Sequence, residues 1–444
     1  MTTTLQPANA PVGRVAAPTR RPVRQVTPAS PSLRLTIAAA IACMPVLVPN
    51  GPGNTSPADL PIVLAMGGVL LWLSRNGVRV NLPYALGMWL LMTGGAIAAL
   101  ANADVRSTAP LAQDLFLLLW AGTIASAVRA DRSLVRLICA TWCWSGVTCA
   151  SLLILGRLAG ISWLAGQTLR DGSRSALTFG DPNLAGNYFV ACLFLVLASR
   201  HPRRPLPRTA AVLAIAMAIV FTGSNGALVG MVVGVVAGLI VGRWRSRGPV
   251  AATGLACVLL VGAGLLLTSV NWTSLQEQAA ASGPVLHDSF GRSDSSSADR
   301  QVLFAEGVRL YWSGNLVGIG PGRTKNVLAA MPAPYVKEAH NDYVATVLEL
   351  GAIGAVGLVV LLTTVATRLQ RLAGGTARGR WGALTAGMPS PQFLVAMGAA
   401  FLVSGAFYEV LHFRHLWAFL GLLAGLDLIR ADTAEAETSD AGRR

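Results

Sequence analysis

The sequence predicts an all-α integral membrane protein with about twelve transmembrane helices, and three observations lead to this prediction. Apolar residues make up 53% of the 444 residues and charged residues 12%, about half of the share that is usual in soluble domains. Apolar runs close to the length of about 20 residues that crosses a bilayer recur along the chain. Short arginine-rich loops separate these runs. The composition therefore excludes a soluble enzyme, a disordered protein and a disulfide scaffold.

The apolar runs place the predicted spans in chain order. They cover residues 33–49, 60–74, 82–101, 110–128, 134–156, 183–199, 208–223, 225–242, 248–270, 342–367, 391–410 and 414–430. Residues 33–430 are thus expected to form one polytopic membrane domain, with a tight helical hairpin over 208–242. Residues 1–32, rich in Pro, Thr, Ala and Arg, predict a disordered cytoplasmic tail. Residues 431–444 predict a polar cytoplasmic tail.

The positions of the arginines predict the orientation. The chain has 35 Lys+Arg against 20 Asp+Glu, a net charge of +15. Most arginines lie in the N-terminal tail and in alternate short loops, which is typical of the cytoplasmic side. Both termini are therefore expected in the cytoplasm. We do not interpret the positive charge as nucleic-acid binding, because the arginines form no basic domain.

The predicted outer loop 157–182 breaks this pattern. It carries Arg157, Arg170 and Arg174 on the side where arginine is disfavoured. Either these arginines have a function on that side, or they only solvate the loop, and the loop alone leaves both interpretations open.

The longest predicted outer loop, 271–341, has internal structure. Ser296 and Asp299 have the spacing of a capping box, and Leu303, Phe304, Val308, Tyr311 and Trp312 follow on one helical face, so the loop is expected to contain an amphipathic helix. The segment Gly318–Gly322 predicts a turn. It does not predict a phosphate loop, because no strand precedes it and Pro321 has no amide hydrogen.

His340 ends this loop, directly before a predicted span. The positive end of a helix dipole favours the neutral form of an imidazole, which is the form that acts as a general base. A structural role for His340 stays open on this argument alone. The histidines and the six cysteines lack the spacing of metal ligands, so we expect neither a metal nor another cofactor.

Four stretches together resemble the O-antigen ligase and O-antigen polymerase family of bacterial membrane glycosyltransferases. The first is Arg174–Ala185, with the letters T-F-G-D-P-N, and the second is Thr222–Leu228. The third joins Ser297–Arg300 to the Gly318–Gly322 turn, and the fourth is A-H-N-D-Y at 339–343 with L-E-L-G at 348–351.

The resemblance implies transfer of a glycan from undecaprenyl diphosphate to an acceptor sugar hydroxyl at the outer face of the bacterial cytoplasmic membrane, without a cofactor. The implied partners are a lipid-linked oligosaccharide donor, a glycan acceptor and membrane lipids. The implied site residues are His340 as the catalytic base, Arg174, Arg170 and Arg300 as diphosphate-binding residues, and Asn183, Asn225, Asn341 and Asp342 as their neighbours.

The sequence departs from the family pattern at one position, because neutral Asn225 stands where the family has an arginine. The candidate substitutes for the missing charge are Arg170, Arg300, Arg323 and Lys325. The departure keeps open a non-catalytic protein that binds glycolipid.

A polysaccharide or lipid transporter is a further alternative. Transporters keep ionisable residues at mid-membrane, and Asp114 and Glu349 are among the few carboxylates within predicted spans. The basic groups, in contrast, cluster outside the spans, which favours chemistry at the membrane surface. Ligase and polymerase activities are not separated by these motifs.

Overall fold

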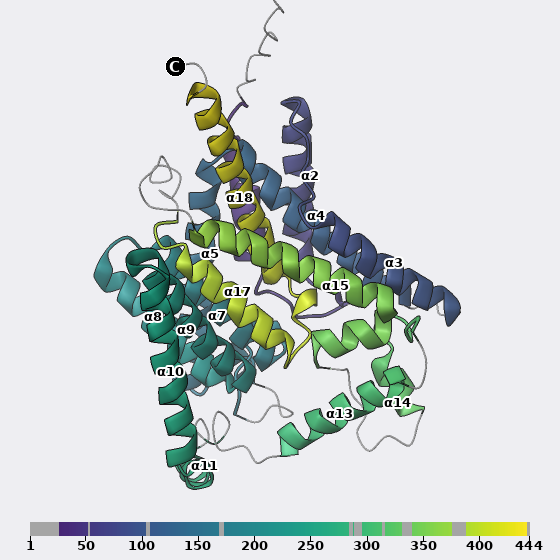
Figure 1. The fold of residues 1–444 in the computed structure, drawn as a ribbon, viewed down its shortest axis with the longest axis vertical. Coiled ribbons are helices and arrows are strands. Elements are labelled where there is room, and N and C mark those ends of the chain that lie inside the picture. Colours follow the sequence, from purple (N-terminus) through teal and green to yellow (C-terminus); the bar gives the residue numbers. More distant parts are fainter. Residues whose placement is uncertain are drawn as a thin grey trace, which may run out of the picture.

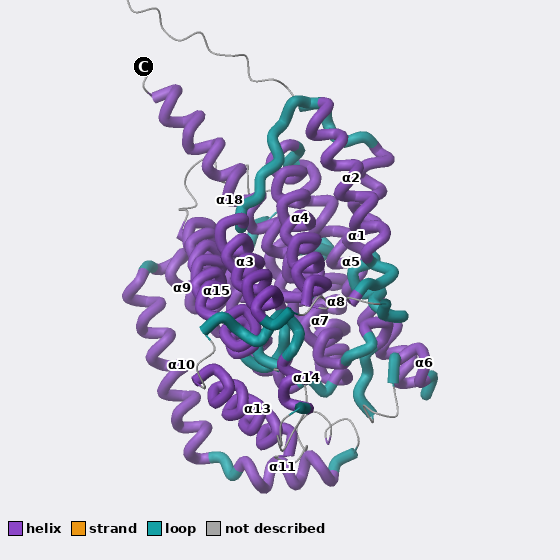
Figure 2. Tube along the Cα trace, turned by 90° about the vertical axis from the view of Figure 1, so that its right-hand side faces the viewer, coloured by secondary structure: helices purple, strands orange, loops and turns teal. Residues whose placement is uncertain are grey.

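A computed structural model describes residues 26–51, 54–103, 107–167, 173–283, 287, 295–312, 316–330, 340–374 and 388–441. Within these ranges the chain forms helices and loops and no strand (Figures 1 and 2). The helices that correspond to predicted spans are α1 (Pro31–Ala42), α2 (Asp59–Arg75), α3 (Ala85–Ala101), α4 (Thr108–Ala130), α5 (Ser133–Leu158), α7 (Pro182–Ser199), α8 (Pro205–Thr222), α9 (Asn225–Arg247), α10 (Pro249–Ser269), α15 (Asp342–Gly374), α17 (Gln392–Gly405) and α18 (Arg414–Ala441).

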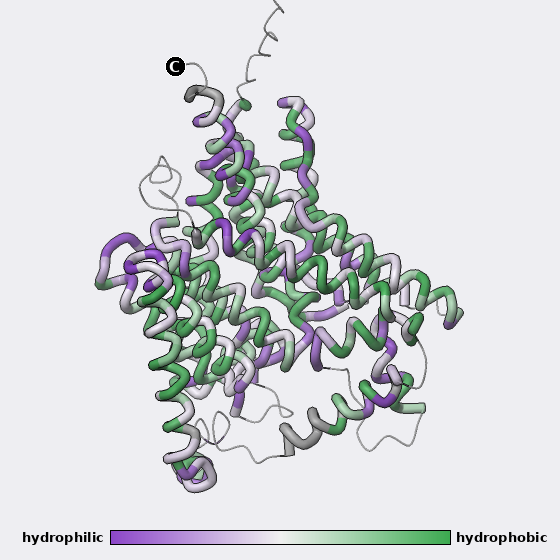
Figure 3. Tube along the Cα trace, viewed as in Figure 1, coloured by the Kyte–Doolittle hydropathy of each residue, from purple (hydrophilic) through white to green (hydrophobic). Residues whose placement is uncertain are grey.

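The predicted fold class is confirmed. Among the described residues, seven helices are long and apolar enough to cross a membrane, namely α4, α5, α7, α8, α9, α10 and α15. Figure 3 colours the chain by the hydropathy of each residue, and hydrophobic stretches run along the helices of the bundle. Shorter apolar helices, among them α1, α3 and α17, complete the bundle. The total of twelve spans stays a prediction.

The first and eleventh predicted spans are shorter as helices than as apolar runs. α1 ends at Ala42, whereas the apolar run continues to residue 49. Pro45 and Pro49 have no amide hydrogen to donate within a helix, and the chain turns aside between them. The amides of Leu47 and Val48 donate to the Thr178 carbonyl at 3.0 and 3.1 Å. α17 ends at Gly405, five residues before the predicted end at 410.

The two terminal tails differ from the simple prediction. Residues 1–25 lie outside the described residues, but residues 26–30 contact the bundle. The Thr27 amide donates to Asn76 Oδ1 at 3.0 Å, and the Ala29 amide donates to Asp131 Oδ2 at 3.2 Å. Ser30 then caps α1. The last residues of the tail predicted as disordered over 1–32 are therefore ordered against the bundle. At the other terminus, α18 continues through the predicted polar tail to Ala441.

The helices pack in pairs, and α7 is the most buried of the seven long apolar helices. The pairs with the most extensive contacts are α15 with α3, α17 with α9, and α18 with α4. Small residues allow the close approach of α3 and α15, since a Cβ added to Gly94 would lie 2.6 Å from the Leu350 carbonyl oxygen. α10 packs mainly on α9 at the periphery and exposes most of its side chains.

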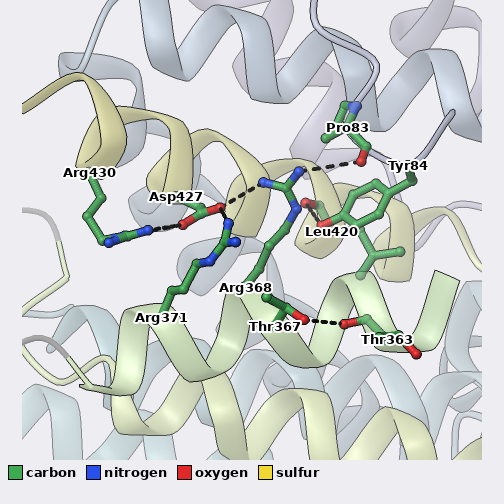
Figure 4. Close-up of polar contacts among 9 residues, drawn as sticks. All are labelled: Pro83, Tyr84, Thr363, Thr367, Arg368, Arg371, Leu420, Asp427 and Arg430. Atoms are coloured by element: carbon green, nitrogen blue, oxygen red, sulfur yellow. Dashed lines mark hydrogen bonds and ion pairs between the residues drawn. The ribbon is translucent and has the colours of Figure 1, made fainter. Parts of the chain in front are cut away.

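Polar contacts between loops gather at two opposite ends of the bundle. At the predicted cytoplasmic end, Arg368, Arg371 and Arg430 surround the Asp427 carboxylate at 3.0, 3.6 and 3.2 Å (Figure 4). The Arg368 guanidinium also lies 5.4 Å from the centre of the Tyr84 ring. This cluster ties α15 and α18 together, and the predicted outer loops meet at the other end of the bundle.

The predicted outer loop contains three helices, α11 (Trp272–Ala281), α13 (Ser295–Trp312) and α14 (Thr324–Ala329). α13 confirms the helix predicted there and starts one residue before Ser296. It packs on the first turns of α15, where Gly307 approaches Val344. In Figure 1, α13 and α14 lie along the same end of the bundle as α11.

The predicted turn at Gly318–Gly322 docks on a kink in α15. Gly318, Gly320 and Gly322 have φ angles of 96°, 102° and 69°, which are accessible to glycine without strain. The Ile319 amide donates to the Leu348 carbonyl at 3.0 Å, next to Gly351, where φ is 66° and the helix is interrupted. The turn thereby fixes the outer part of α15.

Candidate functional site

Arg174 lies in the loop between α6 (Ser162–Ala165) and the 3-10 helix η3 (Leu177–Phe179). Its Nε donates to the Thr222 carbonyl at 3.0 Å, and its Nη2 donates to Asn183 Oδ1 at 2.8 Å. The Ser224 hydroxyl donates to the same Asn183 oxygen at 3.1 Å. The fold therefore brings together the first and second family-like stretches, which are separated in the sequence by most of α7 and α8.

Two helices begin at this cluster. Asp181 caps α7 by accepting from the Asn183 and Leu184 amides at 2.6 and 3.2 Å. Ser224 caps α9 by accepting from the Ala227 amide at 3.3 Å. Asn225, the first residue of α9, is exposed beside Arg174's partners. A helix N-terminus carries a partial positive charge of about half a unit. The start of α9 therefore adds to the attraction of the guanidinium for an anion, whereas the Asp181 carboxylate already occupies the first amides of α7.

Tyr408 connects this cluster to His340. Its side chain lies beside Asp181, Asn183 and Ser224. Its ring lies 5.4 Å from the His340 ring, centre to centre, with an interplanar angle of 34°. Burial, followed by the nearby Asp181 carboxylate, raises the pKa of Tyr408 well above its usual value. The hydroxyl is therefore neutral at physiological pH and keeps its proton for hydrogen bonding.

His340 directly precedes α15 and has a φ of 48°, a left-handed conformation that is uncommon outside glycine. Its amide donates to Glu409 Oε1 at 3.3 Å. Asn341 caps α15 by accepting from the Tyr343 and Val344 amides at 2.9 and 3.1 Å. His340 therefore lies beside a helix start, and its position on the outer side of the membrane stays a prediction.

Asn341 and Asp342 hold the segment that carries Tyr408. The side-chain amide of Asn341 donates from Nδ2 to the Ala406 carbonyl at 3.1 Å. The buried Asp342 carboxylate accepts from the Val410 amide at 2.8 Å and from the Leu411 amide at 3.3 Å. These bonds fix the loop between α17 and α18 against the start of α15, which makes the two residues structural supports of the site.

The remaining predicted cations fall elsewhere or outside the described residues. Arg170 lies outside them. The backbone of Arg300 belongs to α13, and the placement of its side chain lies outside the description. Arg323 and Lys325 lie at α14, next to Thr324, whose amide donates to Glu349 Oε1 at 3.1 Å.

Sequence reasoning missed Tyr408, Glu409 and Ser224. Tyr408 and Glu409 form a polar pair at the outer end of a predicted apolar run, and that pair is the one local signal that could have indicated them. Their proximity to His340 depends on the packing of α17 and α18 against α15.

The two carboxylates predicted within spans, Asp114 and Glu349, lie nearer one end of their helices than the middle. Asp114 is the seventh residue of α4, and Glu349 is the eighth of α15, so both lie about two turns from the start of a helix. Both line a cavity at the same end of the bundle as His340. Among the described residues, no three His, Cys, Asp or Glu side chains are arranged to hold a metal ion.

The fold and the site together define a multi-pass helical membrane protein with one polar centre, built from loops at one end of its bundle. Residues 210–359 match the family model described as O-Antigen ligase. This match confirms the predicted resemblance to the O-antigen ligase and polymerase family, and it supports a role in membrane glycan transfer. It covers the turn at Ser224, the outer loop and His340, whereas Arg174 and Tyr408 lie outside it. No curated protein matches the chain.

Proposed function

We propose that this protein transfers a glycan from undecaprenyl diphosphate to a sugar hydroxyl of an acceptor at the outer face of the bacterial cytoplasmic membrane. Arg174 binds the diphosphate, and His340 is the general base. One observation carries the proposal: Tyr408 contacts the Arg174–Asn183 cluster on one side and the His340 ring on the other. An anion-binding group and an imidazole thus belong to one connected site.

The reaction forms one carbon–oxygen bond and breaks another. The acceptor hydroxyl oxygen attacks the anomeric carbon of the donor sugar, and the bond from that carbon to the diphosphate oxygen breaks. The bonding electrons leave with undecaprenyl diphosphate, and the hydroxyl proton passes to His340. A positioned base typically contributes about 10²–10⁴ in rate.

The leaving group needs stabilisation of charge more than it needs a proton. An arginine presents paired N–H donors that match phosphate oxygens, and the start of α9 adds a backbone dipole of the same sign. Thr222 and Asn183 hold the Arg174 guanidinium before the donor arrives. Losing one such preorganised donor typically costs about 10²–10³ in rate.

An apolar groove offers a place for the polyprenyl chain of the donor. It has a volume of about 790 Å³ and runs between α9, α15, α17 and α18. Tyr343 and Gly405 line it near His340, and Trp244 and Arg245 line it at the opposite end of the bundle. A lipid chain in this groove would cross the membrane with its diphosphate at the polar site.

Asn225 leaves one family charge missing, and we assign Arg170 as its substitute. Arg170 precedes Arg174 by four residues in the same loop, so the length of chain between them allows both side chains to reach one diphosphate. Two guanidinium groups would then balance the two phosphates.

The test is a transfer assay with purified full-length protein, a lipid-linked oligosaccharide donor and a glycan acceptor. Arg174→Ala and His340→Ala are expected to lower transfer at least a hundredfold and to leave the folded protein in the membrane. The matched controls are Arg247→Ala and His287→Ala, both at exposed side chains, and both should retain activity.

EDTA should leave the rate unchanged, because arginine and helix dipoles supply the positive charge in this proposal. Full activity of His340→Ala would remove the base from the proposal. Inhibition by EDTA that added metal reverses would refute the metal-independent reaction. Binding of donor without transfer by the wild type would favour the non-catalytic alternative.

A further inference from the structure

A second cavity adjoins the proposed catalytic centre, and we call it the outer cavity. Its volume is about 440 Å³, within the range of about 300–1,000 Å³ of small-ligand pockets. It lies between α3, α4, α15, the start of α18 and the Pro321–Gly322 turn. Glu409 lines it and also accepts the His340 amide at 3.3 Å, so the cavity and the imidazole share one wall.

The lining combines apolar surface with polar groups of one charge. Met88, Leu91 and Trp417 give it an apolar wall. Four carboxylates and one imidazole supply its ionisable groups, namely Asp114, Asp342, Glu349, Glu409 and His412. The described residues that line the cavity include no lysine or arginine.

Two of these carboxylates, Glu349 and Asp342, accept hydrogen bonds that hold the fold together. Glu349 accepts from the Gly322 amide at 2.6 Å and from Thr324 at 2.6 and 3.1 Å. Asp342 accepts from the Val410 amide at 2.8 Å. Their oxygens are therefore occupied by hydrogen bonds within the fold.

Other polar atoms beside the cavity are not used by the fold. Gln113 Nε2 and His412 Nδ1 have no hydrogen-bond partner among the described residues. The nearest carboxylate oxygen to His412 Nδ1 is Asp114 Oδ1 at 3.8 Å, which is longer than a hydrogen bond. An amide, an imidazole and a carboxylate on one cavity match the donors and acceptors of sugar hydroxyl groups.

The charge of the outer cavity is opposite to that of the Arg174 cluster. Burial lowers the pKa of His412, but Asp114, Glu409, Asp342 and Glu349 together raise it by more, so the imidazole lies in a negative field. An anionic group placed there would face several carboxylates and no lysine or arginine among the described lining residues, with His412 as the one basic group, and an excess of like charge is unfavourable.

We propose that the outer cavity binds a sugar residue of the acceptor glycan, and that its carboxylates select an acceptor without anionic groups. The proposal rests on the proposed function, because it assigns the acceptor to one side of His340 and the donor diphosphate to the other. It defines the acceptor class as uncharged or amino sugars and disfavours uronic acids and phosphorylated sugars.

The test measures binding, so it does not depend on turnover. Full-length protein in nanodiscs is mixed with methyl glycosides of glucose, galactose, mannose and N-acetylglucosamine, and with the glucuronide and galacturonide. Saturation-transfer NMR should detect at least one neutral glycoside and should show at least tenfold weaker binding of its uronide counterpart.

Variants locate the bound sugar. Gln113→Leu and Asp114→Leu should each weaken neutral-glycoside binding at least tenfold, and Asp114→Asn should narrow the discrimination against the uronide. Asp432→Asn, a carboxylate at the opposite end of the bundle, is the matched control and should bind as the wild type does. Circular dichroism and thermal unfolding identify a variant that has lost its fold. If a leucine variant has done so, the binding of the two glycosides to Asp114→Asn tests the proposal instead.

Three outcomes would overturn the proposal. They are equal binding of the neutral glycoside and its uronide, undiminished binding in every cavity variant, and binding of Ca²⁺ with no glycoside bound. A wild type that binds glycoside but transfers nothing would instead refute the proposed function and leave the outer cavity as a sugar site.

Discussion

The rings of Tyr408 and His340 lie 5.4 Å apart, although 68 positions separate the two residues in the chain. The Tyr408 side chain also lies beside Asn183, which accepts a hydrogen bond from Arg174. The Tyr408 side chain therefore lies between the His340 imidazole and the Arg174–Asn183 cluster. A Tyr408→Phe substitution removes the hydroxyl and keeps the ring.

Tyr408→Phe should lower transfer about tenfold, as expected for loss of about 1.4 kcal/mol in a hydrogen-bonded site. The ring contacts to His340 and Phe413 would remain, so the thermal midpoint should change little. The measurement is the transfer rate together with thermal unfolding. Tyr84→Phe removes a buried hydroxyl at the other end and serves as the control. Unchanged transfer in Tyr408→Phe would show that the hydroxyl does not position the site.

Arg170→Ala should be nearly as damaging as Arg174→Ala if Arg170 supplies the charge that Asn225 lacks. Leaving a desolvated charge without its partner costs about 2–5 kcal/mol, so the loss should be large. Asn225→Arg should partly restore activity to Arg170→Ala, since position 225 begins α9 beside the partners of Arg174. Full activity in Arg170→Ala would contradict this assignment and make Arg300 or Arg323 the preferred substitute for the missing charge.

The orientation is testable by cysteine labelling. In a background without the six natural cysteines, Ser173→Cys and Ser297→Cys should react with an impermeant thiol reagent from outside. Ser246→Cys, near the opposite end of α9, should react only after the membrane is opened. Labelling of Ser246→Cys alone would place His340 in the cytoplasm and contradict the proposed reaction.

The ion cluster in Figure 4 should matter more for stability than an exposed pair does. The side chains of Asp427 and Arg368 are 6% and 14% exposed, whereas those of Asp432 and Arg129 are 36% and 38% exposed. Asp427→Ala is expected to cost about 3–5 kcal/mol. Asp432→Ala should cost about 0.2–1 kcal/mol. Equal thermal midpoints of the two variants would contradict this assignment.

His412 should make stability depend on pH. The surrounding carboxylates raise its pKa although burial opposes them, so the folded state binds the proton more tightly than the unfolded state does. The resulting stabilisation is fully present below the unfolded pKa and is lost as the pH rises through the folded pKa. The thermal midpoint of wild type should therefore exceed that of His412→Gln by more at pH 6 than at pH 9. A larger difference at pH 9 would mean that the neutral imidazole is the stabilised form.

The helices could be predicted from the sequence, and so could the candidate site residues Arg174 and His340. Apolar length is a local property, and every predicted span contains a helix, although Pro45 shortens the first. Arg174 and His340 were predictable because each lies in a recognisable motif beside a helix start. Tyr408 was not, because its role comes from the packing of α17 and α18 against α15, and that packing leaves no periodic pattern in the chain.

The last helix, α18, supplies hydrogen-bond and ion-pair partners to helices that precede it in the chain. Arg414 pairs with Asp59 at the start of α2, and the Tyr84 hydroxyl donates to the Leu420 carbonyl. His415 contacts Asn187 of α7 at 2.9 Å, and Asp427 receives Arg368.

Because translation proceeds from the N-terminus, these buried polar groups remain unsatisfied until the ribosome has finished α18. Chains that terminate early would present uncompensated charges inside the bilayer to the cell's quality-control proteases. The bundle therefore lacks these polar partners until α18 has been made and has packed against the earlier helices.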